Sequence, residues 1–303
     1  MPGIEELYES LQGTACGAKL ARNADMSRLT SFRTGGRAAL FLNAASAGEI
    51  IEATKQAKRT GVPYYIIGNG TNLLVSDKGL DALVVRVGEG MGEIRADGAV
   101  FEAGAGAPLS AFAKATVEAG CGGLEWAAGI PGSVGGAVAM NAGAYGGEIA
   151  GVLRDVTFIE DGEVRRLAAR PEDMGYRRSA FRAPGRIVLG ANFALQTDAG
   201  AAQRMREYTR VRREKQPLNY PSAGSTFKRP QGHFAGGLIE AANLKGTRVG
   251  GAMVSELHAG FIINAGGATS ADVYHLIRLV QQRVFESSGV QLETEVMLLG
   301  DFD

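Results

Sequence analysis

Three short segments of the 303-residue chain combine side chains suited to acid–base or charge-stabilising chemistry. In Tyr176-Arg177-Arg178-Ser179, two guanidinium groups lie beside a tyrosine, and a guanidinium can hold a carboxylate at two points. The turn at 222–228, Ser-Ala-Gly-Ser-Thr-Phe-Lys, is made of small residues and would expose Ser225. Near residue 294, Glu293 and Glu295 would share one face of a strand because side chains alternate. Each segment alone is more typical of a polar surface than of an active site.

The distribution of histidine, cysteine and serine argues against several familiar catalytic sites. The three histidines, His233, His258 and His275, belong to no HExxH sequence. Cys16 and Cys121 have neither metal-binding nor redox spacing, so the sequence predicts no metal site. A G-x-S-x-G nucleophile elbow is also missing. Acid–base chemistry must therefore come from Arg, Lys, Ser, Tyr or carboxylate side chains.

Two glycine-rich segments favour a bound ligand that carries phosphate. Residues 129–147, GIPGSVGGAVAMNAGAYGG, contain seven glycines and no charged side chain, and we expect them to form a loop. Residues 68–72, Gly-Asn-Gly-Thr-Asn, directly follow a predicted strand at 64–67. Glycine lets the backbone approach a ligand closely, and free N–H groups can then point at an anion. Two such loops in one chain indicate a large ligand.

Simpler interpretations of these segments stay open at this point. Residues 129–147 could be a run of tight turns, and Asn69-Gly70 is the dipeptide most typical of a β-hairpin turn. The common nucleotide motifs are missing, because the sequence has neither G-x-x-x-x-G-K-[ST] nor a G-x-G-x-x-G that opens a helix. P-loop ATPases and Rossmann domains are therefore disfavoured.

The predicted helices and strands alternate without a regular strand–helix–strand repeat, which indicates an α+β fold. Helices are predicted at 47–60, 108–119 and 201–215, and another begins at Ser270 as its N-cap and ends before Gly289. Strands are predicted at 64–67, 83–87, 100–103, 156–159, 187–195, 261–264 and 292–299. The helix at 201–215 carries six basic residues, most of which we expect on a solvated face. Domain boundaries are predicted near 90 and 197.

Length and charge allow two or three domains and argue against several kinds of partner. The 32 basic and 32 acidic residues give a net charge of zero, so the sequence predicts no nucleic-acid or membrane partner. No apolar run reaches the roughly 18 residues of a membrane span. The acidic N-terminus is unlike a signal peptide. We therefore expect a cytoplasmic protein with reduced thiols.

Taken together in chain order, these segments resemble the UDP-N-acetylenolpyruvoylglucosamine reductase family of peptidoglycan synthesis. The resemblance runs from about Thr30 to Leu299 through TSFRTGG, IIGNGTNLLVSD, GLEWAAGIPGSVGGAVAMNAGAYGGE, YRRSAFR, SAGSTFKRP, GLIEAANLKG and LETEV. The family has a two-subdomain FAD-binding fold of the p-cresol methylhydroxylase type and a C-terminal α+β domain that covers the substrate. The resemblance thus implies FAD-binding subdomains at 1–90 and 91–197, and a substrate-binding domain at 198–303.

The resemblance also implies non-covalent FAD as cofactor, NADPH as reductant and a UDP-sugar as substrate. The two glycine-rich loops would carry the FAD diphosphate, through Gly68, Asn69, Gly70, Thr71, Asn72, Gly129, Ile130, Pro131, Gly132, Ser133, Gly135 and Gly136. Tyr145 and Lys215 occupy positions that contact the sugar nucleotide in the family, and Lys228 is a further candidate for substrate contact.

The family's catalytic residues fall on the three segments described first. Its catalytic arginine falls on Arg177, its proton-donating serine on Ser225 and its acidic residue on Glu295. The implied reaction reduces the enolpyruvyl group of UDP-N-acetylglucosamine-enolpyruvate to the lactyl ether of UDP-N-acetylmuramate. Arg177 would stabilise the enolate, Ser225 would protonate it, and Glu295 would hold the enol or act as the acid.

The chain resembles the shorter branch of the family. Few residues separate Phe181 from the predicted strand at 187–195, which leaves no room for the tyrosine-bearing insertion of the other branch. Leu257 and Gly260 stand where polar residues are more usual.

Two other functions are considered. A flavin oxidase of the same fold, with covalently attached FAD, is disfavoured because the first 232 residues contain no histidine, which leaves Cys121 as the attachment point. A non-catalytic sugar-nucleotide-binding protein would not need Ser225 and Glu295.

Overall fold

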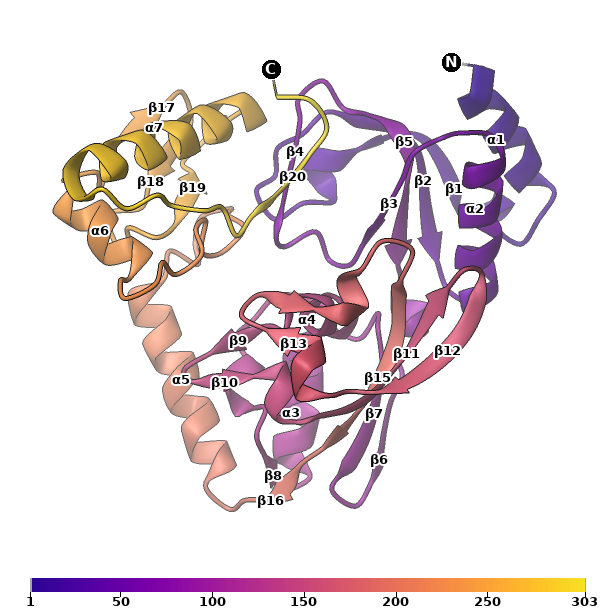
Figure 1. Cartoon of the computed structure of the whole chain (residues 1–303), viewed down its shortest axis with the longest axis horizontal. Coiled ribbons are helices and arrows are strands. Elements are labelled where there is room, and N and C mark those ends of the chain that lie inside the picture. Colours follow the sequence, from indigo (N-terminus) through magenta and orange to yellow (C-terminus); the bar gives the residue numbers. More distant parts are fainter. Residues whose placement is uncertain (1, 303) are drawn as a thin grey trace. The chain divides into compact units, whose positions relative to one another are not determined.

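The computed structural model describes residues 2–302, which form two compact units (Figure 1). The first unit contains the N-terminal residues through Arg22, Leu40–Asn69 and Asp81–Arg212, and the second contains Asn23–Ala39, Gly70–Leu80 and the residues from Arg213 onward. This division does not separate residues 1–90 from 91–197. The domain boundaries near 90 and 197 therefore stay a prediction.

The four predicted helices, at 47–60, 108–119, 201–215 and 270–288, are present as α2, α3, α5 and α7, with one cap misplaced. The α-helices of the described residues are α1 (Pro2–Gln12), α2 (Ala47–Arg59), α3 (Leu109–Glu118), α4 (Val134–Met140), α5 (Ala201–Lys215), α6 (Ala235–Ala241) and α7 (Ser270–Ser288). The prediction of Ser270 as the N-cap of α7 is wrong by one residue. Thr269 is the cap, because its hydroxyl accepts the N–H of Asp272 while the Asp272 carboxylate accepts the N–H of Thr269.

Two sheets contain most strand residues of the first unit. One has the strand order β1 (Leu20–Asp25), β2 (Arg37–Ala44), β5 (Leu80–Val87), β3 (Tyr64–Ile67). The other has the order β12 (Glu163–Ala168), β11 (Leu153–Glu160), β15 (Ile187–Ala194), β7 (Val100–Gly104), β6 (Ile94–Asp97). Strand β3 runs parallel to β5, whereas all pairs of the five-stranded sheet are antiparallel. The α+β prediction is therefore confirmed.

Short two-stranded ladders connect the loops of the first unit. They are β8 (Cys121–Gly122) with β16 (Gln196–Thr197), β9 (Gly143–Ala144) with β10 (Gly147–Glu148), and β13 (Met174–Gly175) with β14 (Arg178–Ser179). Two of these ladders lie in the segments that the sequence analysis singled out for chemistry.

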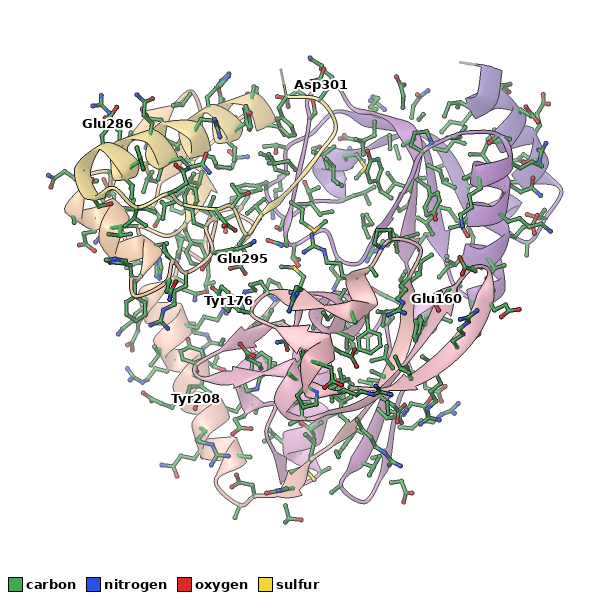
Figure 2. The ribbon with its side chains drawn as sticks, viewed as in Figure 1. Glu160, Tyr176, Tyr208, Glu286, Glu295 and Asp301 are labelled. Atoms are coloured by element: carbon green, nitrogen blue, oxygen red, sulfur yellow. The ribbon has the colours of Figure 1, made fainter. Side chains whose placement is uncertain are left out.

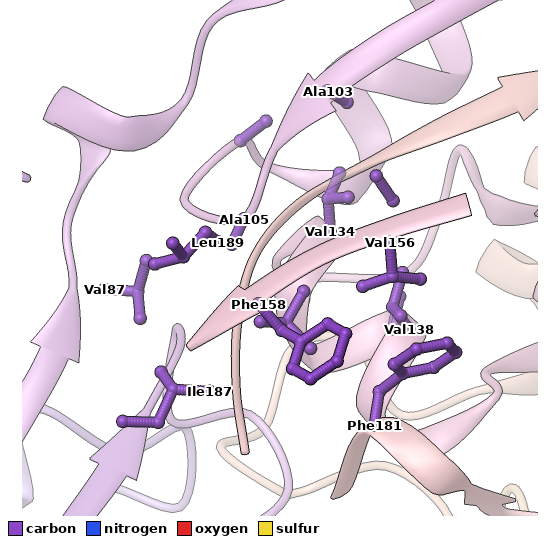
Figure 3. Close-up of a cluster of buried hydrophobic side chains, with 14 of the residues drawn as sticks. Val87, Ala103, Ala105, Val134, Val138, Val156, Phe158, Phe181, Ile187 and Leu189 are labelled. Carbon is purple, nitrogen blue, oxygen red and sulfur yellow. The ribbon is translucent and has the colours of Figure 1, made fainter. Parts of the chain in front are cut away.

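The core of the first unit shows why the second glycine-rich segment is not a loop throughout. Val134 and Val138 of α4 pack in one cluster with Val156 and Phe158 of β11 (Figure 3). Ser133 caps α4 by accepting the N–H of Gly136 at 3.3 Å. The loop prediction for 129–147 is therefore wrong at Val134–Met140, because apolar residues spaced four apart give that stretch a buried face.

The second unit is built from three chain segments. It contains the antiparallel sheet β17 (Arg248–Val249), β18 (Ala252–Val254), β19 (Ile262–Asn264), and the parallel pair β4 (Leu73–Val75) and β20 (Met297–Leu299). One face of α7 is buried against this sheet, including Val273, Ile277 and Val280.

The predicted strand at 292–299 is wrong over most of its length. Only Met297–Leu299 form a strand, and Thr294 makes an isolated bridge with Phe227. The segment cannot continue one regular ladder because its hydrogen-bond partner changes. The N–H of Glu295 donates to the carbonyl of Thr226, whereas the N–H of Met297 donates to the carbonyl of Asn72.

Neither a membrane-crossing helix nor a disulfide is found within residues 2–302. No helix there is both long and apolar enough to cross a membrane. Cys16 and Cys121 are buried free thiols, and burial raises the pKa of the Cys16 thiol.

Candidate active site

The two glycine-rich segments meet in the first unit. A Cβ atom added to Gly68 would lie 2.3 Å from Ser133 Oγ, so the Ser133 side chain can lie against residue 68 only because residue 68 has no side chain. Two main-chain hydrogen bonds of 2.9 Å fix the segment around Ser133, from Leu109 N–H to the Gly132 carbonyl and from Val134 N–H to the Ala107 carbonyl. The structure thus brings together residues of both segments, as a shared ligand would require.

The segment at 68–72 is not a hairpin turn. The strand before it, β3, pairs in parallel with β5, and the strand after it, β4, pairs with β20. At Gly70 the backbone has a φ of +64°, and a Cβ atom would lie 1.9 Å from the carbonyl oxygen of Leu29. The Gly70 carbonyl accepts the N–H of Ser31 at 3.1 Å. Glycine is therefore required at position 70 by both its conformation and its surroundings.

Gly70→Ala is expected to destabilise the protein by more than the roughly 1–2 kcal/mol that a left-handed backbone costs an L residue. It is also expected to lower the affinity for FAD, since Leu29 must move. Gly61→Ala is the matched control, because Gly61 has a φ of +68° and nothing within 4 Å of an added Cβ atom. Thermal unfolding and flavin fluorescence measure both effects, and equal losses in the two variants would contradict the steric argument.

Arg212 of α5 is a cation that the sequence analysis did not single out. Its Nε is buried and has no hydrogen-bond partner among residues 2–302. A Cβ atom added to Gly129 would lie 2.5 Å from Arg212 Cδ, so the side chain lies against the second glycine-rich segment. Burial lowers the pKa of this guanidinium. Arg212 is therefore an exception among the basic residues of α5, most of which were expected to be solvated, and its surroundings fit an anionic ligand.

A second unpartnered group lies beside Gly70. The hydroxyl oxygen of Ser31 is buried and lacks a hydrogen-bond partner among the described residues, although the Ser31 N–H is bonded to Gly70. Buried hydroxyls are normally paired, so a ligand that reaches residue 70 would satisfy this one.

Arg177 lies in the tight turn between β13 and β14, in the left-handed conformation with a φ of 54°. Its side chain is half-buried, and Nη2 donates to the Gly143 carbonyl at 3.2 Å. The side chain of Asn141 ties the same hairpin to the glycine-rich segment by donating to the Gly175 carbonyl at 2.9 Å. Arg178, in contrast, is exposed. The structure therefore distinguishes the two arginines and places Arg177 at the glycine-rich segment.

Ser225 and Glu295 lie on adjacent chain segments of the second unit. Between them, the Thr226 carbonyl accepts the N–H of Glu295 at 2.9 Å, and the buried Thr226 hydroxyl accepts the N–H of Ile262 at 3.0 Å. The Glu295 carbonyl accepts from Asn72 Nδ2 at 3.0 Å. Ser225 is exposed, and Glu295 is half-buried before β20 (Figure 2). Ser225 and Glu295 are thus held on one hydrogen-bonded frame about Thr226.

Glu293 has a different environment from Glu295. Its carboxylate is 71% exposed and pairs with Lys228 Nζ at 3.0 Å. The Lys228 N–H also donates to the Glu293 carbonyl. The sequence pattern could not choose between the two carboxylates, whereas the structure gives Glu293 a surface ion pair.

Of the remaining substrate candidates, Tyr145 and Lys215 are exposed and Lys228 is half-buried. Tyr145 has a φ of 53°, and its ring stacks on Tyr208 of α5 with centroids 4.6 Å apart. Its hydroxyl donates to the Tyr208 carbonyl at 3.4 Å. Lys215, the last residue of α5, is exposed. Tyr145 belongs to the first unit, as Arg177 does, whereas Lys215 and Lys228 belong to the second, as Ser225 and Glu295 do.

Known proteins match nearly the whole chain. Residues 38–167 match the model of an FAD binding domain, and residues 216–299 match that of the UDP-N-acetylenolpyruvoylglucosamine reductase C-terminal domain. The chain is 47% identical to the UDP-N-acetylenolpyruvoylglucosamine reductase of Clostridium botulinum over 279 residues, which cover 91% of each protein. The chain belongs to the UDP-N-acetylenolpyruvoylglucosamine reductase family.

Two further family members agree with this assignment. The enzyme of Agathobacter rectalis is 47% identical over 93% of this chain and 95% of its own length. The crystal structure of the family's enzyme from Thermus caldophilus has a TM-score of 0.78 and 35% identity, and it covers 93% of this chain and 98% of that one. The chain thus has an FAD binding domain followed by the family's C-terminal domain, which confirms the predicted order of an FAD-binding fold and a C-terminal α+β domain.

One sequence signal could have identified Arg212 in advance. Ala201, Met205, Tyr208 and Arg212 follow the three- and four-residue spacing of one helix face, and all are at least half-buried. A cation that falls on the buried face of a helix is more informative than one on a solvated face. Ser31 had no comparable signal, because a serine in a loop is usually solvated.

Proposed function

We propose that this chain reduces the enolpyruvyl group of UDP-N-acetylglucosamine-enolpyruvate to give UDP-N-acetylmuramate in peptidoglycan synthesis. The observation that carries the proposal is the joint placement of Ser225 and Glu295 about Thr226, within a chain whose N-terminal part matches an FAD binding domain. FAD, when bound, would supply the hydride chemistry, with NADPH as its reductant. NADPH and UDP-sugars are compounds of the cytoplasm, so we place the protein there. A net charge of zero gives no general attraction to nucleic acid.

We assign the FAD diphosphate to the two glycine-rich segments. Gly68 and Gly70 allow close approach of the backbone, and Ser133 adds a hydroxyl at the point where the segments meet. Non-covalent binding is supported by the lack of histidine before residue 233 and by the burial of Cys121. Residues 129–136 and 68–72 thereby keep the cofactor role that the resemblance implied.

Arg177, Ser225 and Glu295 have distinct roles in the proposed reaction. Addition of hydride to the vinyl carbon leaves negative charge on the neighbouring carbon and its carboxylate. Arg177 stabilises this enolate through a two-point grip, which the planar guanidinium allows and lysine does not. Ser225 donates the proton that completes the reduction. Glu295 holds the enol by a hydrogen bond or supplies the proton itself.

Tyr145, Lys215 and Lys228 are proposed to bind the sugar nucleotide. Lysine ammonium groups suit the diphosphate of the substrate as point charges. Lys228 would have to exchange its ion pair with Glu293 for the substrate phosphate, at small cost because the pair is at the surface.

The overall function is tested by following the flavin absorbance of the purified protein. A yellow protein should lose its colour with NADPH and regain it with the enolpyruvyl sugar nucleotide. Acid precipitation should release the flavin into the supernatant. A colourless protein would support a sugar-nucleotide-binding role, and flavin retained in the pellet would contradict the non-covalent assignment.

Ser225→Ala is expected to leave flavin reduction by NADPH unchanged and to slow reoxidation by the substrate by about 10²- to 10⁴-fold, the usual contribution of a positioned proton donor. Stopped-flow absorbance separates the two half-reactions. Ser222→Ala is the control, because it removes a hydroxyl from the same turn. Equal losses in both half-reactions would show a folding or cofactor-binding defect and would remove Ser225 from the chemistry.

A further inference from the structure

A half-buried arginine lies beside the first glycine-rich segment without an acceptor. Arg86 of β5 is the strand partner of Ile67 of β3, the residue directly before Gly68. The Nε atom of Arg86 is buried and has no hydrogen-bond partner among residues 2–302, and the described residues give it no ion pair. The sequence analysis assigned this residue no role.

The alternation of β5 determines which face of its sheet carries Arg86. Its neighbours Val85 and Val87 belong to the core cluster that includes residues of α1 and α2. Helices α1 and α2 lie side by side (Figure 1). Since successive side chains of a strand project to opposite faces, Arg86 points to the face opposite Val85 and Val87. Ile67 projects to the same face as its partner Arg86 and is not part of that core cluster. The arginine is therefore directed away from the helices, on the face shared with the end of β3.

The charges nearby indicate what Arg86 binds. Residues 64–76 and 129–147, which contain the proposed diphosphate segments, include no lysine or arginine. A diphosphate carries about two negative charges, which the backbone N–H groups of these segments and Arg212, beside Gly129, would have to balance without Arg86. A guanidinium can bind phosphate oxygens at two points, and a half-buried cation is stabilised when it gains such a partner.

We propose that Arg86 binds the diphosphate of FAD and supplies positive charge that the glycine-rich segments lack. The inference rests on the proposed placement of the diphosphate at residues 68–72. Arg86 then serves cofactor affinity rather than the stability of the sheet. Replacing Arg86 should leave the fold intact. In the protein without flavin, the replacement removes a charge whose Nε atom makes no hydrogen bond to the described residues.

The test compares Arg86→Gln with the wild type, using full-length protein freed of flavin. FAD and riboflavin are titrated by flavin fluorescence, and ADP is titrated by calorimetry. Arg86→Gln is expected to weaken FAD and ADP by about 10- to 100-fold, the effect of one charge-assisted hydrogen bond, and to leave riboflavin unchanged because riboflavin has no phosphate. Arg86→Lys keeps the positive charge but not the planar two-point donor, so its affinity for FAD and ADP should fall by less than that of Arg86→Gln.

Arg59→Gln is the matched control. Arg59 lies on α2, is 51% exposed and pairs with Glu6 at 2.7 Å, so all three affinities should equal those of the wild type. Equal FAD affinity in Arg86→Gln and wild type would overturn the role of Arg86 alone. An equal loss of riboflavin affinity would overturn that role as well, and so would a lower melting temperature of Arg86→Gln without ligand. A wild-type protein that binds no FAD would instead overturn the proposed cofactor site.

Discussion

Glu295→Gln is expected to slow reoxidation of the flavin by the enolpyruvyl substrate by about 10²- to 10³-fold, the usual effect of removing a well-placed electrostatic group. Glutamine keeps the shape of the side chain and one acceptor but loses the charge and the proton. The main chain of residue 295 is fixed by Thr226 and Asn72, so the substitution should leave its position unchanged. Flavin reduction by NADPH should stay at the wild-type rate. Stopped-flow absorbance measures both steps.

Glu293→Gln is the control for this prediction. Its carboxylate is in a surface ion pair with Lys228, and such pairs contribute only about 0–1 kcal/mol. We therefore expect both half-reactions to remain close to the wild type. An inactive Glu293→Gln together with an active Glu295→Gln would exchange the roles of the two carboxylates and would contradict the assignment.

Arg177→Lys is expected to lower turnover by about 10- to 100-fold, since a two-point charge-assisted contact with the substrate carboxylate becomes a single one. Lysine keeps the positive charge, and both residues pay the same cost for the left-handed backbone at this turn. FAD content should therefore be retained. The ratio of bound flavin to protein and the steady-state kcat provide the two measurements.

Arg178→Lys isolates the position of the charge. Arg178 is exposed and follows Arg177 in the sequence. The variant therefore tests whether any arginine of this turn could hold the substrate carboxylate. Wild-type turnover is expected for this variant. Full activity of Arg177→Lys would instead move Arg177 out of the proposed substrate contact.

The sequence predicted most of the regular structure, because apolar spacing reports directly on burial. The helix at 201–215 and the strand at 64–67 have the predicted bounds. The prediction from sequence failed where the hydrogen-bond partner of a segment changes along the chain. Residues 292–299 alternate as a strand should, yet they pair first with Thr226 and then with Asn72. Local pattern carries no information on such a change of partner.

The candidate site was predictable only in part, for a related reason. Gly68 and Gly70 stand out in the sequence because their lack of a side chain is itself the signal. Arg212 is marked only by its position on the buried face of a predicted helix, and Arg86 by no pattern, since arginine is common on surfaces. Only the three-dimensional surroundings leave both Nε atoms without a partner among the described residues. The roles of Arg177, Ser225 and Glu295 came from the resemblance, and they stay proposals for the experiments above.

The pairing of β20 with β4 constrains how the protein can be made in the cell. Met297 and Leu73 are strand partners although more than two hundred residues separate them in the chain. During translation, β4 leaves the ribosome early but cannot pair until synthesis has passed Leu299. Contacts between such distant segments form slowly, and unpaired strand edges are prone to aggregate in the meantime. Asn72 thus gains its bond to the Glu295 carbonyl only late, after nearly the whole chain has been synthesised.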